Sequence, residues 1–367
     1  MRTLKGIMCR GGVVGAPQAG PAARPSGQRQ HRGQRPRVSR HPRRPWIVSA
    51  LAALTTGAAL TLGLTGCAGL GERVSGSNGR MDIAVVAKGY ASPFWAAVKV
   101  GTMAAGQDLG VNVTFSGPDT ESDVVRQVDQ INLAHVQHPD AFVFAALDSS
   151  ASVIALQQFV DSGIPVIAFD SGVPGSDIPV STVATDNRAA AAEAAKHMAE
   201  LLGGEGKVAV LAQSSTSVTG TDRRDGFIGW LAANAPGVDV VDVQYNDSDQ
   251  AKAEQQAAAI LQAHPDLAGM FATDDDGAVA AAQTVRRTER DVQVIGFDSG
   301  AVQIGLIRKG VMAGAVTQNP YQMGYIAVEK AVAAAKGEEV EPEIDSGFYW
   351  YDATNLDDPD IQKAVYD

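Results

Sequence analysis

Acidic, amide and aromatic side chains gather in this sequence at the points where apolar, β-branched runs end. Carboxylates and amides form paired hydrogen bonds with hydroxyl groups, and an aromatic face can stack on the apolar side of a sugar ring. Together these residue types predict a cleft for a small polyhydroxylated molecule. The candidate residues for this cleft are Lys88, Tyr90, Ser92, Phe94, Trp95, Asp170, Ser171, Asp274, Asp298 and Gln318.

Motifs for catalysis or for metal binding are weak. The adjacent carboxylates Asp274, Asp275 and Asp276 could bind a divalent cation, but the glycine and terminal glutamate of a calcium loop are missing. The last two are instead expected to favour the positive end of a helix that begins near residue 278. The six histidines lack metal-ligand spacing, and no G-x-S-x-G motif is present. We therefore predict a protein that is not an enzyme and that needs no cofactor or metal.

The elements that must position the candidate residues alternate between strand and helix from residue 81 onward. Strands with little polar alternation are typical of parallel sheets covered on both faces. Strands are expected at residues 81–86, 112–116, 141–145, 165–169, 207–211, 238–244, 268–272, 292–297 and 313–318. Helices are expected at residues 94–109, 121–137, 152–161, 188–202, 222–234, 250–262, 278–287, 302–309 and 321–335.

These strands are too many for one comfortable open sheet, so the predicted fold class is α/β with two doubly wound parallel-sheet lobes. Open parallel sheets bind ligands beyond the carboxyl ends of their strands. The candidate residues follow the strands directly, so this fold would bring them to one cleft.

Charge is divided unequally along the chain. All 41 acidic residues lie after position 66, whereas 11 of the 30 basic residues lie before it, which leaves 19 basic residues in the rest of the chain. An acidic surface repels a phosphate backbone, so we expect no nucleic-acid partner. The chain has only Cys9 and Cys67, and no disulfide framework is expected.

The first 66 residues have the composition of an export segment. Residues 1–45 are rich in Arg, Gly, Pro and Gln and are expected to form a disordered basic extension. An apolar run then follows three arginines, which predicts a lipoprotein signal peptide at residues 46–66. Residues 64–67 (LTGC) resemble a bacterial lipobox, so Cys67 is the predicted lipidation site and residues 67–80 the tether.

An uncleaved membrane span is the alternative for the apolar run, which is long enough to cross a bilayer. In both cases the folded part is expected outside the cytoplasm, anchored to the outer face of the cytoplasmic membrane.

Over roughly residues 81–355 the sequence resembles the ribose-type periplasmic binding protein family. The resemblance rests on the order and spacing of the segments at residues 92–95 (SPFW), 163–170 (GIPVIAFD), 184–187 (ATDN), 294–298 (VIGFD) and 318–320 (QNP). It implies a type I periplasmic binding protein-like fold with a three-crossing hinge near residues 185–187, 318 and 336–345. Lobe one would comprise residues 81–185 with 319–340, and lobe two residues 186–318 with 341–367.

The resemblance also implies roles for single residues. Phe94 and Trp95 fall at the family's aromatic sandwich, although aromatic residues at a helix start can also pack into the core. Asp170, Asp298 and Gln318 match ligand-binding positions of the family.

Other positions depart from the family pattern. Ser92 and Asp274 stand where the family often has asparagine. Ser171 stands where ribose binders have an arginine, and the arginine position of the second lobe falls at or near Thr221, with Arg223 two residues later. Loss of a bidentate guanidinium changes which ring hydroxyls are recognised. The predicted ligand is therefore not simply ribose, and a neutral or cationic ligand is favoured over a phosphorylated one.

The loop that carries Lys88 and Tyr90 is one residue longer than in the ribose pattern. Lys88 either supplies a missing hydrogen-bond donor to the ligand or is a solvated surface charge. These alternatives remain open at the level of sequence.

The predicted function is that of an extracytoplasmic, monomeric lipoprotein that captures a small sugar or polyol for an ABC permease. The alternative is a ligand-sensing receptor component that signals to a membrane sensor. A sugar-responsive repressor of the same fold would need a helix-turn-helix headpiece, and an export segment precedes residue 80 instead.

Overall fold

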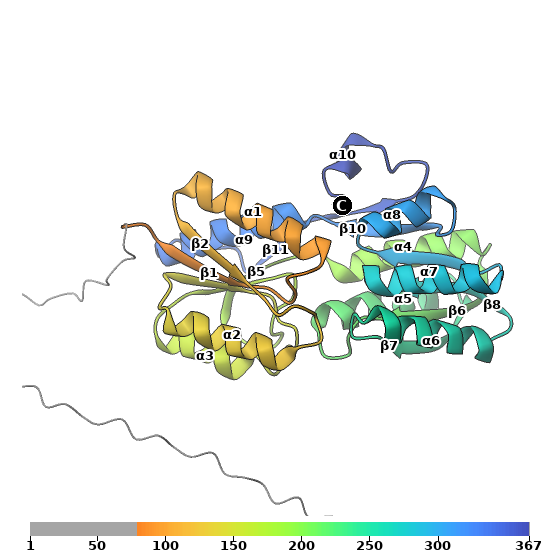
Figure 1. The fold of residues 1–367 in the computed structure, drawn as a ribbon, viewed down its shortest axis with the longest axis horizontal. Coiled ribbons are helices and arrows are strands. Elements are labelled where there is room, and N and C mark those ends of the chain that lie inside the picture. The colour runs from red at the N-terminus through yellow and green to blue at the C-terminus, as the bar shows by residue number, and fades with distance from the viewer. Residues whose placement is uncertain (1–78, 367) are drawn as a thin grey trace, which may run out of the picture. The chain divides into compact units, whose positions relative to one another are not determined.

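The computed structural model describes residues 79–366, all of which belong to one compact unit. Two six-stranded sheets divide this unit into two lobes, which Figure 1 shows side by side. The expected basic extension 1–45, the signal peptide 46–66, Cys67 and the tether up to residue 78 lie outside the described residues. Within residues 79–366, no helix is both long and apolar enough to span a bilayer.

The first sheet is entirely parallel and has the strand order β11-β5-β4-β3-β1-β2. Its strands are β1 (Asp82–Val86), β2 (Asn112–Ser116), β3 (Ala141–Phe144), β4 (Val166–Phe169), β5 (Pro179–Ala184) and β11 (Glu343–Asp345). Its helices are α1 (Pro93–Leu109), α2 (Val124–Val136), α3 (Val153–Asp161) and α9 (Pro320–Ala335). Helices α1 and α9 cover one face and α2 and α3 the other (Figure 1). Successive residues of β1 therefore enter different cores, Ile83 under α1 and Ala84 under α2.

The second sheet has the order β12-β10-β9-β8-β6-β7, and only β12 runs antiparallel to its neighbour. Its strands are β6 (Glu205–Ala212), β7 (Gly237–Tyr245), β8 (Leu267–Ala272), β9 (Gln293–Phe297), β10 (Gly314–Gln318) and β12 (Phe348–Tyr351). Its helices are α4 (Asn187–Leu201), α5 (Val218–Asn234), α6 (Gln250–Ala263), α7 (Asp275–Thr288) and α8 (Ala301–Arg308), and α10 (Pro359–Gln362) follows β12. Val210 packs under α4 and α5, and Leu211 under α6 and α7.

The chain passes between the lobes three times, after β5, after β10 and after β11. One hydroxyl group connects all three crossings. Thr185 Oγ1 donates to Gln318 Oε1 at 3.0 Å and lies 3.4 Å from Ser346 Oγ. All three side chains are buried, so the crossings form one hydrogen-bonded hinge region.

The third crossing lies later in the chain than the sequence predicts. The prediction assigned residues 341–367 to lobe two, but β11 pairs with β5 in the first sheet. This assignment was wrong for residues 343–345, and the chain crosses at Ser346 and Gly347. The strand is only three residues long and two of them are acidic, so its sequence carries no strand pattern. Its position is set by pairing with β5.

The predicted fold class is confirmed: both lobes are α/β, with parallel strands enclosed by helices. Strand β5 was missed because it begins with a proline and alternates between buried and less buried residues. Helix α5 begins at Val218, four residues before the expected start at Asp222.

Candidate ligand-binding site

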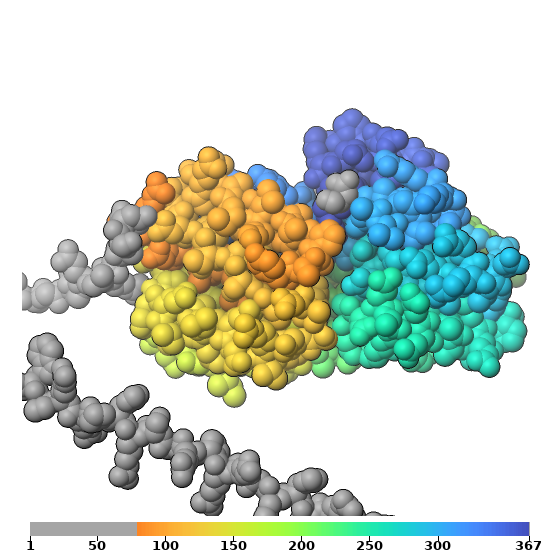
Figure 2. Space-filling view, viewed as in Figure 1, coloured from red at the N-terminus to blue at the C-terminus, as the bar shows by residue number. Residues whose placement is uncertain are grey.

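A cavity of about 330 Å³ lies between the two lobes, at the carboxyl ends of strands from both sheets. Figure 2 shows the seam at which the first lobe, in orange and yellow, meets the second, in green and blue. The volume is in the range of small-molecule pockets. Most of the predicted binding residues line it: Lys88, Ser92, Phe94, Trp95, Asp170, Arg223, Asp274, Asp298 and Gln318.

The aromatic wall of the cavity begins at the first turn of α1. Ser92 caps this helix, because its Oγ accepts from the backbone N–H of Trp95 at 3.4 Å, and Pro93 starts the helix with a preset φ. The rings of Phe94 and Trp95 meet edge to face with centroids 4.8 Å apart. Both also belong to the core of the first lobe, so they border the cavity and pack into the core at once.

Lys88 is a buried ion-pair partner, with only 3% of its side chain exposed. Its Nζ lies 2.6 Å from Asp170 Oδ2 and 3.9 Å from Glu121 Oε2. The same Nζ donates to Thr219 Oγ1 of the second lobe at 3.2 Å. Lys88 is therefore not a solvated surface charge, and it connects the two lobes at the edge of the cavity.

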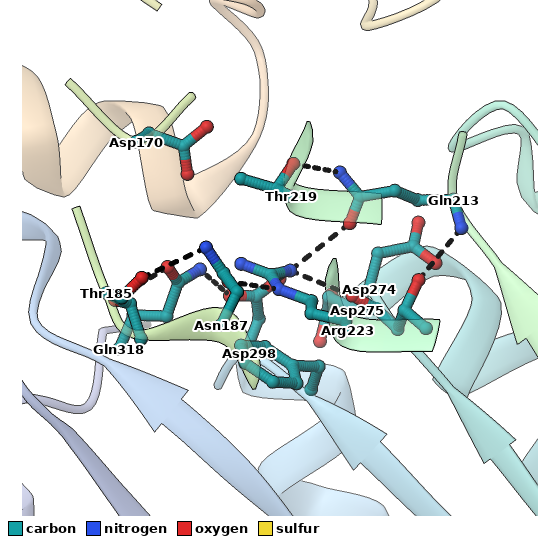
Figure 3. Close-up of polar contacts among 12 residues, drawn as sticks. Asp170, Thr185, Asn187, Gln213, Thr219, Arg223, Asp274, Asp275, Asp298 and Gln318 are labelled. Atoms are coloured by element: carbon teal, nitrogen blue, oxygen red, sulfur yellow. Dashed lines mark hydrogen bonds and ion pairs between the residues drawn. The ribbon is translucent and has the colours of Figure 1, made fainter. Parts of the chain in front are cut away.

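Arg223 of α5 forms the base of the cavity in the second lobe (Figure 3). Its Nε donates to Asn187 Oδ1 at 2.8 Å, and one terminal nitrogen donates to the Thr273 carbonyl at 2.8 Å and to Gln213 Oε1 at 3.2 Å. Its guanidinium carbon lies 3.7 Å from the centre of the Phe297 ring. These contacts hold the guanidinium group in one orientation.

Asp298 connects Arg223 with the hinge. Asp298 Oδ2 lies 3.7 Å from the Arg223 guanidinium, and Oδ1 accepts from Gln318 Nε2 at 2.7 Å. Burial raises the pKa of Asp298, while Arg223 and Gln318 act in the opposite direction. Because Gln318 also accepts from Thr185, the cavity and the three crossings share one network, visible in Figure 3.

The cavity is strongly acidic. Lys88 and Arg223 are its two basic residues, whereas seven acidic residues line it: Asp119, Glu121, Asp170, Asp274, Asp275, Asp276 and Asp298. Burial, with Asp276 and Asp298 nearby, raises the pKa of Asp274 well above its usual value. The same causes raise the pKa of Asp275 to about 7. Among the described residues, no group of three or more His, Cys, Asp or Glu side chains is arranged to hold a metal ion.

Three predicted residues do not line the cavity. Tyr90 is exposed, and its hydroxyl accepts from Lys99 Nζ at 2.6 Å. Ser171 is buried below the cavity, where its Oγ donates to the Ala146 carbonyl at 2.6 Å. Thr221 lies inside α5, and its Oγ1 donates to the Val218 carbonyl at 3.1 Å. The threonine of α5 that contacts Lys88 is instead Thr219, two residues earlier.

Several lining residues were absent from the prediction. Glu121, Gln213 and Ser248 follow β2, β6 and β7, so the rule that ligands lie beyond the carboxyl ends of strands would have found them. Glu121 was instead placed inside a helix, although α2 begins only at Val124. Tyr366 comes from the segment after α10, and no sequence signal pointed to it.

Comparison with known proteins places the chain in a family. Residues 83–339 match the family model described as a periplasmic binding protein domain. The chain is 27% identical over 270 residues to the ribose import binding protein of Bacillus subtilis (strain 168). The matched region covers 74% of this chain and 87% of the relative.

Two solved structures are also similar. One is a carbohydrate transporter solute binding protein from Agrobacterium radiobacter in complex with D-arabinose, with 29% identity and a TM-score of 0.74. The other is an ABC transporter solute binding protein from Agrobacterium vitis with bound D-fucose, with 31% identity and a TM-score of 0.74. The matches cover 79% and 78% of this chain and 100% of both other chains.

The names of these relatives describe binding and import and no enzymatic activity, in agreement with the prediction that the chain is not an enzyme. The matches cover most of this chain and extend over both lobes. The chain therefore belongs to the ribose-type periplasmic binding protein family.

Proposed function

We propose that this protein captures a small sugar or polyol between its lobes, outside the cytoplasm, and delivers it to an ABC importer. The observation that carries this proposal is the cavity between the two sheets, which combines the aromatic wall of Phe94 and Trp95 with carboxylate and amide groups from both lobes. Such groups bind ring hydroxyls in pairs, while aromatic faces cover the apolar side of the ring.

The relatives support the import role. Their names describe ribose import, carbohydrate transport and ABC transporter solute binding, and two were solved with D-arabinose and D-fucose. A sensing role has no comparable support among these names. We therefore favour import over the receptor alternative.

Capture would work by shifting an equilibrium between open and closed lobes. The lobes already touch beside the cavity, through the bond from Lys88 to Thr219 and a backbone bond from Ser149 N to the Thr216 carbonyl at 3.1 Å. A ligand that bonds Asp170 in one lobe and Asp298 in the other would be held by both only when the lobes are closed. Such a ligand favours closure because these contacts are made only in the closed state.

We further propose that the protein acts as a monomer tethered to the membrane by a lipid on Cys67, after cleavage of residues 46–66. Support comes from the sequence LTGC at residues 64–67 behind an apolar run. Cells fed labelled palmitate should incorporate label into the protein, and Cys67→Ala should abolish labelling and accumulate as a precursor that keeps residues 46–66. An unlabelled wild-type protein that keeps residues 46–66 would favour the uncleaved span instead.

The function is tested by calorimetry and thermal unfolding of the purified protein with pentoses, hexoses and hexitols, and with amino acids and nucleosides as comparison ligands. A ligand at a hundred times its Kd stabilises the folded state by about 2.7 kcal/mol. We expect stabilisation by one or a few related sugars or polyols. A response confined to amino acids or nucleosides would leave the fold intact and refute the proposed ligand class.

A further inference from the structure

We propose that the ligand carries a protonated amine beside its hydroxyl groups, as in an amino sugar or an amino polyol, and that Asp274 binds this amine. The inference rests on the capture function proposed above and goes beyond it, because the sugars named for the relatives are neutral. Asp274 lines the cavity at the start of α7.

The first argument is the use of the two basic side chains. Lys88 is engaged by Asp170 at 2.6 Å, and Arg223 is held by Asn187, the Thr273 carbonyl and Gln213, with Asp298 at 3.7 Å. Neither cation pairs with the carboxylates of Asp274, Asp275 or Asp276. This side of the cavity therefore concentrates negative charge for which the described residues supply no paired cation.

The second argument is the poor hydrogen bonding of Asp274 itself. Only 6% of this residue is exposed, yet Oδ1 accepts a single long bond, from Asn246 Nδ2 at 3.4 Å. Oδ2 is buried and has no hydrogen-bond partner among residues 79–366. Asp274 also does not use its side chain to cap α7. A buried carboxylate without donors is costly, so its occurrence in a cavity wall points to a donor on the ligand.

The chemistry of that donor follows from the charge. A hydroxyl donates one proton and can pair with Asp274 without ionising it, whereas an ammonium group donates three protons and, being positive, stabilises the ionised carboxylate. A metal ion would need several ligands in one place, and the described residues contain no such group. The aromatic wall and the pair Asp298–Gln318 remain suited to a carbon ring and its hydroxyls.

The electrostatic setting agrees with this geometry. Asp276, Asp298 and Glu121 all raise the pKa of Asp274, in addition to the effect of burial. An ammonium group placed among these carboxylates would favour their ionised forms. Binding of an amine should therefore release protons from the site, whereas binding of a neutral sugar should not.

The test compares matched pairs that differ in one amine: D-glucosamine with D-glucose, D-galactosamine with D-galactose, D-mannosamine with D-mannose, and D-glucamine with D-glucitol. Calorimetry with the purified protein gives Kd and, in buffers of different ionisation enthalpy, the protons released. We expect at least one amine to bind about tenfold or more tightly than its hydroxyl counterpart, as charge-assisted bonds are stronger than neutral ones. Proton release should accompany its binding.

Asp274→Asn is the decisive variant, because it keeps the shape of the side chain and removes the charge. It should reduce the preference for the amine about tenfold and lower the number of protons released, while still binding the neutral partner. Asp291→Asn is the matched control, since Asp291 is an exposed carboxylate after α7 that does not line the cavity. This control should leave the preference within about twofold.

The outcomes separate the two proposals. Tighter binding of the neutral member in every pair, or an amine preference that survives Asp274→Asn, would overturn the amine inference and leave sugar capture standing. Absence of binding by every neutral and amino sugar would overturn both.

Discussion

Asp170 and Asp298 occupy equivalent positions in the two lobes, directly after β4 and β9, and both adopt a left-handed backbone with φ of 56° and 74°. The N–H of Asp170 donates to Val183 of β5, and the N–H of Asp298 to Val316 of β10. Each carboxylate has one buried basic neighbour, Lys88 or Arg223. Both lobes therefore contain the same left-handed turn. Each turn directs one carboxylate toward the cavity between the sheets.

This relationship predicts that Asp298→Asn weakens ligand binding at least about tenfold without unfolding the protein. The variant removes the charge that faces Arg223, and a bound hydroxyl loses a charged acceptor. Asparagine tolerates a positive φ, so the backbone should stay in place. Calorimetric titration with the sugar found in the ligand screen checks the loss of affinity.

Asp298→Ala provides a comparison, because alanine should lose the same affinity and also lower the free energy of unfolding through strain at φ 74°. Full affinity in Asp298→Asn would mean that this carboxylate does not contact the ligand.

Replacement of Lys88 should destabilise the protein even without ligand. Lys88→Met removes one partner of a buried ion pair and leaves Asp170 buried with an uncompensated charge, which typically costs about 3–5 kcal/mol. The double variant Lys88→Met/Asp170→Asn should recover at least half of that loss, because no charge is then left unpaired. Urea unfolding of the single and double variants measures both effects. Equal stability of the two variants would show that the pair is not coupled.

The carboxyl group of Asp275 predicts a dependence of stability on pH. Its pKa is about 7 in the folded protein, well above the ordinary value of 3.8, so the folded chain binds this proton more tightly than the unfolded chain. The stability that this more tightly bound proton gives the folded protein is fully present below about pH 4 and is lost as pH rises through about 7. A difference of three pKa units between the folded and unfolded chain corresponds to about 4 kcal/mol in the free energy of unfolding.

Asp275→Asn cannot ionise and should escape this loss. We expect the variant and the wild type to be similarly stable near pH 4, and the variant to be more stable by about 2–4 kcal/mol at pH 8, in unfolding measured without ligand. Asp266→Asn is a control for which the expected dependence of stability on pH is opposite. The bond to Lys207 lowers the pKa of Asp266 instead of raising it. Parallel pH profiles of Asp275→Asn and the wild type would contradict the prediction.

Close packing of α1 on α9 predicts that Gly101→Ala lowers the free energy of unfolding by about 1–3 kcal/mol. A Cβ at Gly101 would lie 2.0 Å from the Tyr321 carbonyl oxygen, and one at Gly324 would lie 2.4 Å from the Val98 carbonyl oxygen. Gly229→Ala in α5 is the matched control, since no heavy atom lies within 4 Å of its would-be Cβ. The control should gain up to about 1 kcal/mol from helix propensity. A stabilised Gly101→Ala in thermal unfolding would refute the close contact.

Much of the architecture could be predicted because buried parallel strands leave continuous apolar runs. The run at residues 141–145 became β3, whose residues are all buried. Strand β5 escaped this rule because one side of it is less buried, and β11 because pairing alone defines it. Local patterns therefore located most strands, including the edge strands β2 and β7, and missed strands without a continuous apolar run.

The candidate site was predictable as far as it follows strand ends. Asp170 and Asp298 come directly after apolar strands, and their positions in the cavity follow from the topology. The burial of Lys88 could not be read from the sequence, because Thr219, its partner in the second lobe, is 131 residues away. Tyr366 likewise reaches the cavity by tertiary packing against Phe94.

Helix α9 has a consequence for how the chain acquires its fold. Met323, Ala327 and Val328 of this helix are fully buried against the first sheet, although α9 follows the main part of the second lobe in the chain. Residues 79–185 alone would cover that face of the sheet only with α1 and would leave the area under α9 open to water. During synthesis from the N-terminal end, β6–β10 must therefore be made before lobe one can complete its core. Because β12 of the second sheet comes later still, neither lobe can complete its core until the segment through β12 has been synthesised.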